Sequence, residues 1–181
     1  PPPRARIEGT GTWRPECPVG REDLRRLDVN FVDFEGNVRR GDLIANRDTI
    51  DDLAEIFTEL FNEGFPIEAM RSVEKYDGDV RASLEANNTS AFNCRYVAGT
   101  TTWSQHAFGR AIDINPVENP YVDGSHVSPL RGRRYLDRSD VRPGMIVRGE
   151  VVLRAFRRIG WGWGGGWSPA KDYQHFSANG H

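Results

Sequence analysis

One long amphipathic segment, accompanied by much shorter apolar ones, limits what this chain can fold into. In residues 48–62 the apolar side chains recur at spacings of three and four residues, which predicts an α-helix with one buried face. The residues on that face are Ile50, Leu53, Ala54, Ile56, Phe57, Leu60 and Phe61. Asp48 is the expected N-cap and Gly64 the expected stop. A second, shorter helix is predicted over 149–159 by the same spacing.

The other apolar segments are too short for helices and are predicted as strands. They lie at 38–45, 66–70 and 111–114, and a helical turn or two is expected at 79–86. Residues 119–143 are rich in Gly, Pro, Asp and Arg and are predicted to be a long loop. Helices and strands follow one another without regular alternation, which favours an α+β fold with a small antiparallel sheet and flanking helices.

Length and charge indicate one folded domain. The 181 residues fit a single domain, in which we expect residues 1–37 to form an N-terminal arm and leading segment packed on a domain of residues 38–181. The net charge of −2 provides no overall basic field to collect nucleic acid. No apolar run approaches the roughly 20 residues that span a bilayer, and no signal peptide is expected in this chain.

Residues 104–113, with the sequence S-Q-H-A-F-G-R-A-I-D, carry the first pattern that points to chemistry. Gly109 and the apolar run after it predict a loop that turns into a strand. Such a turn would bring His106 on the loop and Asp113 on the strand toward one ion. Asp113 lies between two isoleucines, and a buried carboxylate requires a partner, of which a metal ion is one of the few effective kinds.

Residues 172–176, with the sequence D-Y-Q-H-F, carry the second pattern. His175 would complete a set of two histidine nitrogens and one carboxylate oxygen, the usual composition of a hydrolytic zinc site. Asp172 precedes it by three residues and would lie beside the metal as a general base. Spacing alone leaves the alternative open, because a single histidine is more often a core or surface group than a ligand.

The first pattern matches S-x-H-x-x-G-x-A-x-D, the signature of the VanY-type D-alanyl-D-alanine carboxypeptidase family. That family belongs to the peptidoglycan zinc peptidases, together with VanX and the L-alanyl-D-glutamate endopeptidases. The D-x-x-H of the second pattern is similar to the second motif of the family, and the resemblance extends over about residues 38–177.

The resemblance implies one zinc ion per chain and a hydrolytic mechanism. The implied zinc ligands are His106, Asp113 and His175. Asp172 corresponds to the base that takes a proton from the attacking water and passes it to the leaving amine. An arginine upstream of the first motif is expected to bind a substrate carboxylate or the developing oxyanion. Arg95 is the candidate for this arginine, and Arg71 is the reserve.

Two further residues are expected near the substrate. Ser104 corresponds to a serine that lies at the substrate end of the site in relatives. Trp167 ends the stretch W-G-W-G-G-G-W at 161–167, and similar stretches precede the last motif in relatives. The alternative for this stretch is a glycine-permitted turn whose tryptophans cover the core. Gln174 stands where many relatives have tryptophan, which affects the expected shape of the pocket but not the metal.

Other patterns are assigned no chemistry. Gly160, Gly162 and Gly165 satisfy G-x-G-x-x-G, but they follow a predicted helix and open none, so a dinucleotide site is not expected. His126 and His181 are expected at the surface.

The resemblance predicts hydrolysis of a peptide bond in a peptidoglycan stem peptide by a secreted or cell-envelope metallopeptidase acting as a monomer. The first expectation is a D-alanyl-D-alanine carboxypeptidase. The alternatives are an L-alanyl-D-glutamate or cross-bridge endopeptidase, or a zinc-binding module without activity. Cys17 and Cys94 are either buried thiols or one disulfide, and action outside the membrane favours the disulfide.

Overall fold

The computed structural model describes residues 12–181, so the first part of the expected N-terminal arm lies outside the described residues. A long antiparallel hairpin opens the fold. It pairs β1 (Leu24–Val32) with β2 (Val38–Asn46) along their whole length. Asp33 closes the turn, because its Oδ1 accepts hydrogen bonds from the backbone N–H groups of Glu35 and Asn37.

The first strand of this hairpin was not predicted. Leu27, Val29 and Phe31 alternate with polar Asp28 and Asn30, as in a strand with one buried face, but the two arginines that follow Leu24 break this alternation at the start of the strand. The pairing brings residues 24–32 onto the same hydrophobic core as the residues after 38. The division of the chain at residue 37 stays a prediction.

Helix α1 (Ile50–Asn62) packs against the hairpin and confirms the predicted helix. The prediction of Asp48 as its N-cap is wrong. The capping position belongs to Thr49, whose hydroxyl donates to the carbonyl of Asn46 at 3.0 Å instead of accepting from the helix. Asp48 lies outside the helix and forms an ion pair with Arg110 at 2.5 Å.

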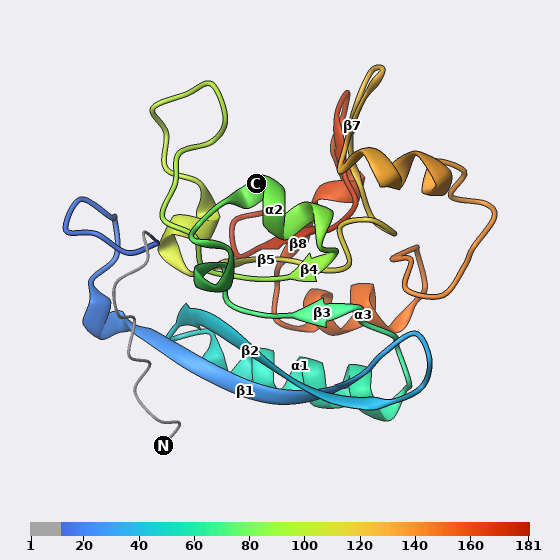
Figure 1. The fold of residues 1–181 in the computed structure, drawn as a ribbon, viewed down its shortest axis with the longest axis horizontal. Coiled ribbons are helices and arrows are strands. Elements are labelled where there is room, and N and C mark those ends of the chain that lie inside the picture. Colours follow the sequence, from blue (N-terminus) through green and yellow to red (C-terminus); the bar gives the residue numbers. More distant parts are fainter. Residues whose placement is uncertain (1–11) are drawn as a thin grey trace.

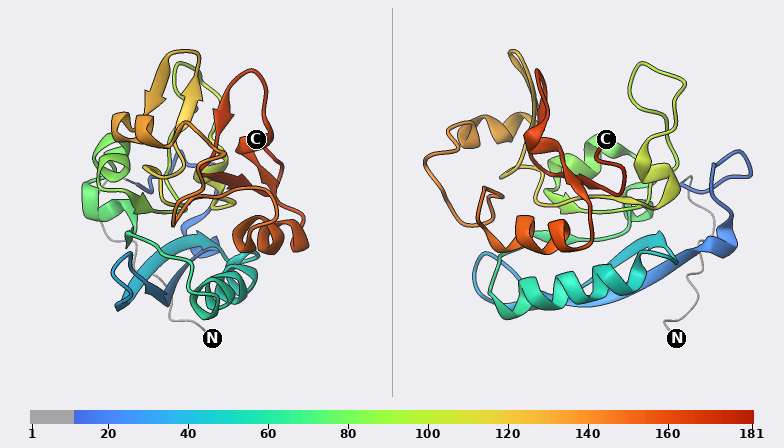
Figure 2. Two further views of the ribbon diagram at one scale, coloured as in Figure 1. Left: turned by 90° about the vertical axis from the view of Figure 1, so that its right-hand side faces the viewer. Right: turned by 180° about the vertical axis from the view of Figure 1, so that it is seen from behind.

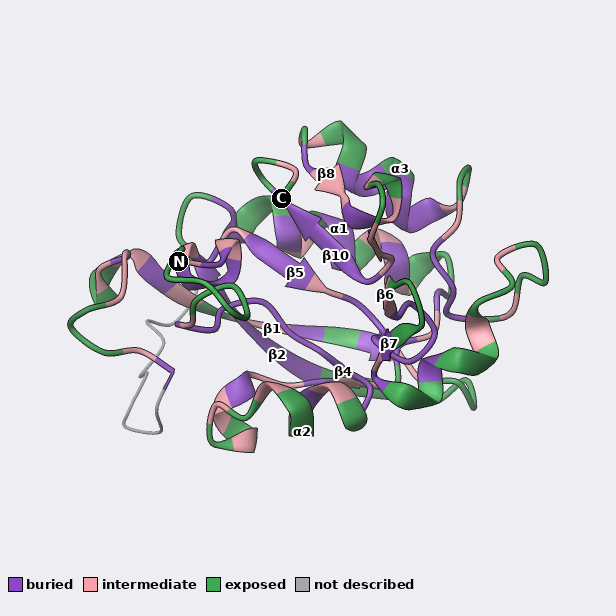
Figure 3. Ribbon diagram, turned by 90° about the horizontal axis from the view of Figure 1, so that it is seen from above, coloured by how far each residue is buried: buried purple, intermediate pink, exposed green. Residues whose placement is uncertain are grey.

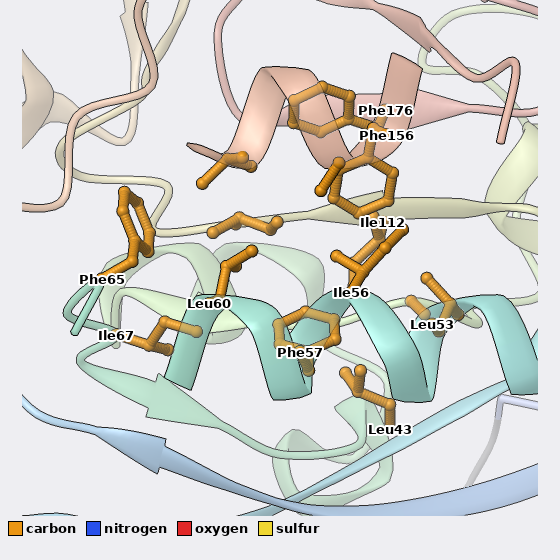
Figure 4. Close-up of a cluster of buried hydrophobic side chains, with 14 of the residues drawn as sticks. Leu43, Leu53, Ile56, Phe57, Leu60, Phe65, Ile67, Ile112, Phe156 and Phe176 are labelled. Atoms are coloured by element: carbon orange, nitrogen blue, oxygen red, sulfur yellow. The ribbon is translucent and has the colours of Figure 1, made fainter. Parts of the chain in front are cut away.

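Helix α1 lies along one side of the second half of the chain (Figure 2), and a hydrophobic core fills the space between them (Figure 4). Helix α3 (Val151–Arg158) confirms the second predicted helix and contributes Phe156, which stacks on Phe176 with ring centroids 4.2 Å apart. Ile112 is fully buried in the same cluster. Phe176 and Ile112 are the immediate neighbours of His175 and Asp113, so packing of the core fixes the strands that carry the candidate ligands.

The sheets are small and mostly antiparallel, which confirms the predicted α+β class. One three-stranded antiparallel sheet has the order β5 (Ala111–Asp113), β10 (His175–Ser177), β8 (Gly162–Trp163). β5 confirms the strand predicted at 111–114. Strands β5 and β10 are mostly buried in the middle of the molecule, with exposed segments around them (Figure 3).

The predicted loop at 119–143 contains regular structure, so that prediction is wrong in part. It includes the hairpin of β6 (Tyr121–Asp123) and β7 (His126–Ser128), followed by the 3₁₀ helix η4 (Leu130–Tyr135). β6 also pairs with β9 (Lys171–Asp172), giving the sheet order β7-β6-β9. Strands of three residues are too short to leave an alternation that the sequence reveals.

The remaining elements are short. The strand predicted at 66–70 is reduced to β3 (Ala69–Met70), which pairs in parallel with β4 (Asn88–Thr89). The turn predicted at 79–86 is helix α2 (Val80–Glu85), capped by Asp79. The 3₁₀ helices are η1 (Arg21–Asp23), η2 (Val73–Tyr76), η3 (Gln105–Phe108) and η5 (Gly164–Gly166).

Two projections rise on the side of the molecule opposite α1 (Figure 1). One is the loop around residues 96–103, and the other is the β6–β7 hairpin; β5 runs between their bases. Cys17 and Cys94 form a disulfide, as expected, which ties the segment before η1 to the residues just before the first loop. No helix in the described part of the chain is long and apolar enough to cross a membrane.

Candidate metal centre

The first motif folds into a capped turn that leads directly into a strand. Ser104 is the N-cap of η3, and its hydroxyl accepts the N–H of His106 at 3.3 Å. Gly109 ends the turn with φ +68°, a conformation that favours glycine. The chain then enters β5, which ends at Asp113. The expected change from loop to strand is therefore present. The buried Ser104 hydroxyl caps the turn at which this change begins.

His106 is buried and oriented by a backbone carbonyl. Its Nδ1 lies 2.6 Å from the carbonyl oxygen of Ala91, which makes Nδ1 the protonated nitrogen. Its Nε2 therefore presents a lone pair, and it lies 3.2 Å from Asp113 Oδ2 and 3.2 Å from His175 Nδ1.

His175 reaches the same point from the opposite strand. It is the register partner of Asp113 in the β5–β10 pair, and its Nδ1 lies 3.1 Å from Asp113 Oδ1. Its Nε2 lies 3.2 Å from the backbone oxygen of His181. Each histidine thus has one nitrogen bound to a backbone oxygen and the other directed at Asp113.

The three side chains influence one another's ionisation. Burial alone would raise the pKa of the Asp113 carboxyl, but the neighbouring histidines, His106 above all, hold it well below its usual range. Burial would lower the pKa of His175, whereas its hydrogen bond to Asp113 and the charges of Asp113 and Asp172 raise it. The Asp113 carboxyl is therefore held in its ionised form in a buried, polar site, where a cation can offset its charge.

These groups fit a metal ion. The ligand atoms of His106, Asp113 and His175 all lie within 4.8 Å of one another. Two imidazole nitrogens and one carboxylate oxygen form a donor set that suits zinc and leaves a further coordination position for a water or substrate oxygen. The second ring nitrogen of each histidine, Nδ1 of His106 and Nε2 of His175, contacts a backbone oxygen. Such contacts orient metal-binding histidines.

Asp172 lies in β9, opposite Tyr121 of β6, and is near enough to Asp113 and His175 for their charges to shift its pKa. Its Oδ1 is buried and has no hydrogen-bond partner among the described residues. Burial and the charge of Asp113 raise the pKa of Asp172 to about 7, while His175 and Arg95 oppose that rise. A carboxylate with a free buried oxygen near the ligands can accept a proton.

Arg95 also faces this region. Together with Asn93, it lines a hollow that reaches His106 and Asp113. The opposite wall of the hollow comes from η2 and α2: Val73, Val80, Ser83 and Leu84. The Nε of Arg95 is buried without a hydrogen-bond partner in residues 12–181. The hollow therefore holds an available donor near the centre.

The other expected substrate residues have different surroundings. Arg71 forms an ion pair with Asp42 at 3.2 Å and is not among the residues of the hollow. Trp167 packs near His175, with ring centroids 5.4 Å apart, and its Nε1 donates to the carbonyl of Gly180. The structure thus places Arg95 in the wall of the hollow, pairs Arg71 with Asp42, and packs Trp167 near the ring of His175, a possible ligand.

Gln174 is buried and directed away from the hollow. Its Nε2 donates to the carbonyl of Asn119 at 3.3 Å. Gln174, which stands where many relatives have tryptophan, therefore lies in the interior of the protein and not among the residues that line the hollow.

Two functional groups gave no signal in the sequence. They are the backbone oxygens of Ala91 and His181, which orient the two histidines. A backbone oxygen has no residue signature, so only the fold reveals it. The side chain of His181 is exposed, as is that of His126, and stacks on Trp167 with ring centroids 6.3 Å apart.

Comparison with known families agrees with this geometry. Residues 98–178 match the family described as D-alanyl-D-alanine carboxypeptidase, and both motifs lie within the match. Residues 98–178 are thus similar to the VanY-type family. The VanY-type peptidases are metal-dependent, in agreement with the three converging ligand atoms. Arg95, α1 and the β1–β2 hairpin precede the matched residues. No curated protein and no solved structure gives a significant match to the chain.

Proposed function

We propose that the protein is a zinc-dependent D-alanyl-D-alanine carboxypeptidase that hydrolyses peptidoglycan stem peptides. The observation that carries the proposal is the convergence of His106, Asp113 and His175, with Asp172 beside them. One zinc ion per chain would be held by the first three residues. When bound, zinc would polarise the scissile carbonyl and lower the pKa of a water molecule toward about 7.

Asp172 supplies the proton transfer in this proposal. Its unpartnered Oδ1 is the atom that accepts a proton from the attacking water, and it returns the proton to the leaving amine. His106 and His175 keep their orientation during this step, because the backbone oxygens of Ala91 and His181 bind His106 Nδ1 and His175 Nε2.

Arg95 supplies positive charge at the hollow. Its buried, unpartnered Nε is suited to a substrate carboxylate or a developing oxyanion, since a charge-assisted hydrogen bond is strongest in a dry site. A cation at the end of the hollow supports carboxypeptidase action, because such an enzyme must recognise a free terminal carboxylate.

We further propose that the protein works outside the membrane and as a monomer. The Cys17–Cys94 disulfide supports an oxidising compartment. All groups proposed for the reaction come from one chain, which supports action as a monomer.

The test is metal content combined with cleavage of a defined peptide. We expect one zinc per chain by elemental analysis, loss of zinc in His106→Ala, and cleavage of a stem pentapeptide that a chelator abolishes. Asp172→Asn should keep zinc and lose about 10²–10⁴-fold in kcat, the usual contribution of a general base.

Alternative outcomes separate the other functions. Equal cleavage of the pentapeptide and its C-terminal amide would indicate an endopeptidase. Bound zinc without cleavage of any wall peptide would indicate a binding module. Wild-type protein without metal, or full turnover by Asp172→Asn, would overturn the proposal.

A further inference from the structure

A buried polar network lies beside the candidate centre and takes no part in the proposed reaction. Its hub is the fully buried side chain of Asn119. The Nδ2 of Asn119 donates to the carbonyls of Ile114, Asn115 and Gly144 at 3.2, 3.2 and 2.9 Å. Its Oδ1 accepts the backbone N–H of Ile146 at 2.7 Å. One side chain thus joins residues 114–115 to residues 144–146.

Arg138 brings a charge into this network. Its Nη2 donates to Asn119 Oδ1 at 2.9 Å and to the carbonyl of Ile146 at 2.7 Å, and its Nη1 donates to the carbonyl of Glu118 at 2.7 Å. Within residues 12–181, the guanidinium of Arg138 contacts neutral oxygens and one aromatic ring. Arg138 is half-buried, and taking part of its charge out of water without a carboxylate is costly, so the several hydrogen bonds of its planar guanidinium offset that cost.

The network connects the two strands that carry the candidate ligands. Gln174, the residue before His175, donates through Nε2 to the carbonyl of Asn119 at 3.3 Å. The carbonyl of Gln174 accepts the N–H of Ile114, the residue after Asp113, at 3.0 Å. Displacement of Asn119 would therefore alter the placement of one strand relative to the other.

Arg138 also contacts the segment that carries the proposed base. Its guanidinium lies over the ring of Tyr173, 4.4 Å from the centroid, and Tyr173 follows Asp172. The backbone of Tyr173 is fixed from two other sides, by a hydrogen bond to Pro120 at 3.3 Å and one from Trp163 Nε1 at 2.9 Å. The ring and backbone of Tyr173 therefore lock the segment between Asp172 and the second histidine.

We propose that Arg138 is a positioning residue that sets the placement of His175 relative to Asp113 through Asn119 and Gln174, and that of Asp172 through the ring of Tyr173. The inference rests on the proposed function, because the groups that Arg138 positions are the proposed base and ligands. Lysine would replace it only in part, because a single ammonium does not donate in the planar, forked geometry that Asn119, Ile146 and Glu118 require.

The test is metal affinity of folded variants, measured by competition with a chromophoric chelator. Arg138→Met is expected to weaken zinc binding about 10–100-fold, as loss of groups that orient ligands generally does. Arg138→Lys is expected to fall between this variant and the wild type. The visible spectrum of the cobalt(II)-substituted protein should change, and kcat should fall while KM changes little.

Arg142→Met is the matched control, since Arg142 lies in the same segment but stacks on Tyr135 and pairs with Asp140 at 3.5 Å. Its zinc affinity and cobalt spectrum should equal those of the wild type. If Arg138→Met does not fold, Gln174→Leu provides the test, because it removes one link and leaves Arg138 in place.

Wild-type zinc affinity in a folded Arg138→Met or Gln174→Leu would overturn the inference and leave the proposed function standing. A wild-type protein that binds no metal would overturn the proposed function, and the inference with it.

Discussion

Asp172 has a pKa raised to about 7, chiefly because burial and the charge of Asp113 disfavour its ionised form. As a base, Asp172 acts only when deprotonated, so kcat/KM should rise with pH through the pKa of this carboxyl. A bound dication lowers that pKa, so the midpoint in the zinc-loaded protein should lie below about 7. The measurement is the pH profile of kcat/KM with a saturating supply of zinc.

The slope of this acidic limb should correspond to one proton. A profile without an acidic limb, at a pH where zinc stays bound, would contradict the role of Asp172 as base. Zinc content measured at each pH separates this result from loss of metal.

Arg95 and Arg71 were both candidates for binding a substrate carboxylate. Because only Arg95 lines the hollow, a variant of Arg71 is the control for the same variant of Arg95. Arg95→Met should raise KM for a peptide with a free carboxyl terminus by about 10–100-fold, the equivalent of a lost hydrogen bond to a charged group. Arg71→Met should leave KM nearly unchanged, since Arg71 is engaged with Asp42. Steady-state kinetics on both variants decides between them; a larger effect in Arg71→Met would contradict the assignment.

At the scale of elements, Gly109 is the point at which η3 turns into β5. It has φ +68°, and a Cβ there would approach the backbone nitrogen of Asn46 to 2.6 Å. Gly109→Ala should therefore destabilise the protein by more than the roughly 1–2 kcal/mol of left-handed strain alone, and should weaken zinc binding because His106 and Asp113 flank the turn.

Gly99→Ala is the control for this variant. Gly99 also has positive φ, +74°, but nothing lies within 4 Å of its added Cβ. Urea denaturation of both variants should show the larger loss for Gly109→Ala. Equal losses would mean that the contact with the β2 backbone has no influence.

How much the sequence predicts depends on the kind of element. Three- and four-residue spacing located α1 and α3, and the isoleucines around Asp113 located β5, because each has a face buried in one core. The first strand of the hairpin was missed although Leu27, Val29 and Phe31 alternate with Asp28 and Asn30, since this pattern is short and follows two charged residues, Arg25 and Arg26.

The candidate ligands were predictable because their side chains carry the chemistry. What holds them was not predictable. Ala91 acts through a backbone carbonyl, and Arg138 acts through contacts between segments distant in sequence. Such contacts arise only when the chain has folded, so spacing within one segment does not record them.

At the scale of the whole molecule, the Cys17–Cys94 disulfide links the leading segment to the neighbourhood of the site. It spans 77 residues. The residue after Cys94 is Arg95, and the residue before it, Asn93, donates its N–H to the carbonyl of His106 at 3.1 Å. Loss of the disulfide should therefore affect both stability and the hollow.

The double variant Cys17→Ser, Cys94→Ser should lose about 4–5 kcal/mol in free energy of unfolding, from the entropy of closing a loop of this length. It should also raise KM, because Arg95 is then less restrained, while zinc affinity falls less, since core packing around Ile112 and Phe176 still fixes the ligand strands. Urea denaturation, steady-state kinetics and zinc competition on the folded variant provide the three readouts. Free thiols in the native wild type, or a variant as stable as the wild type, would contradict this account of the disulfide.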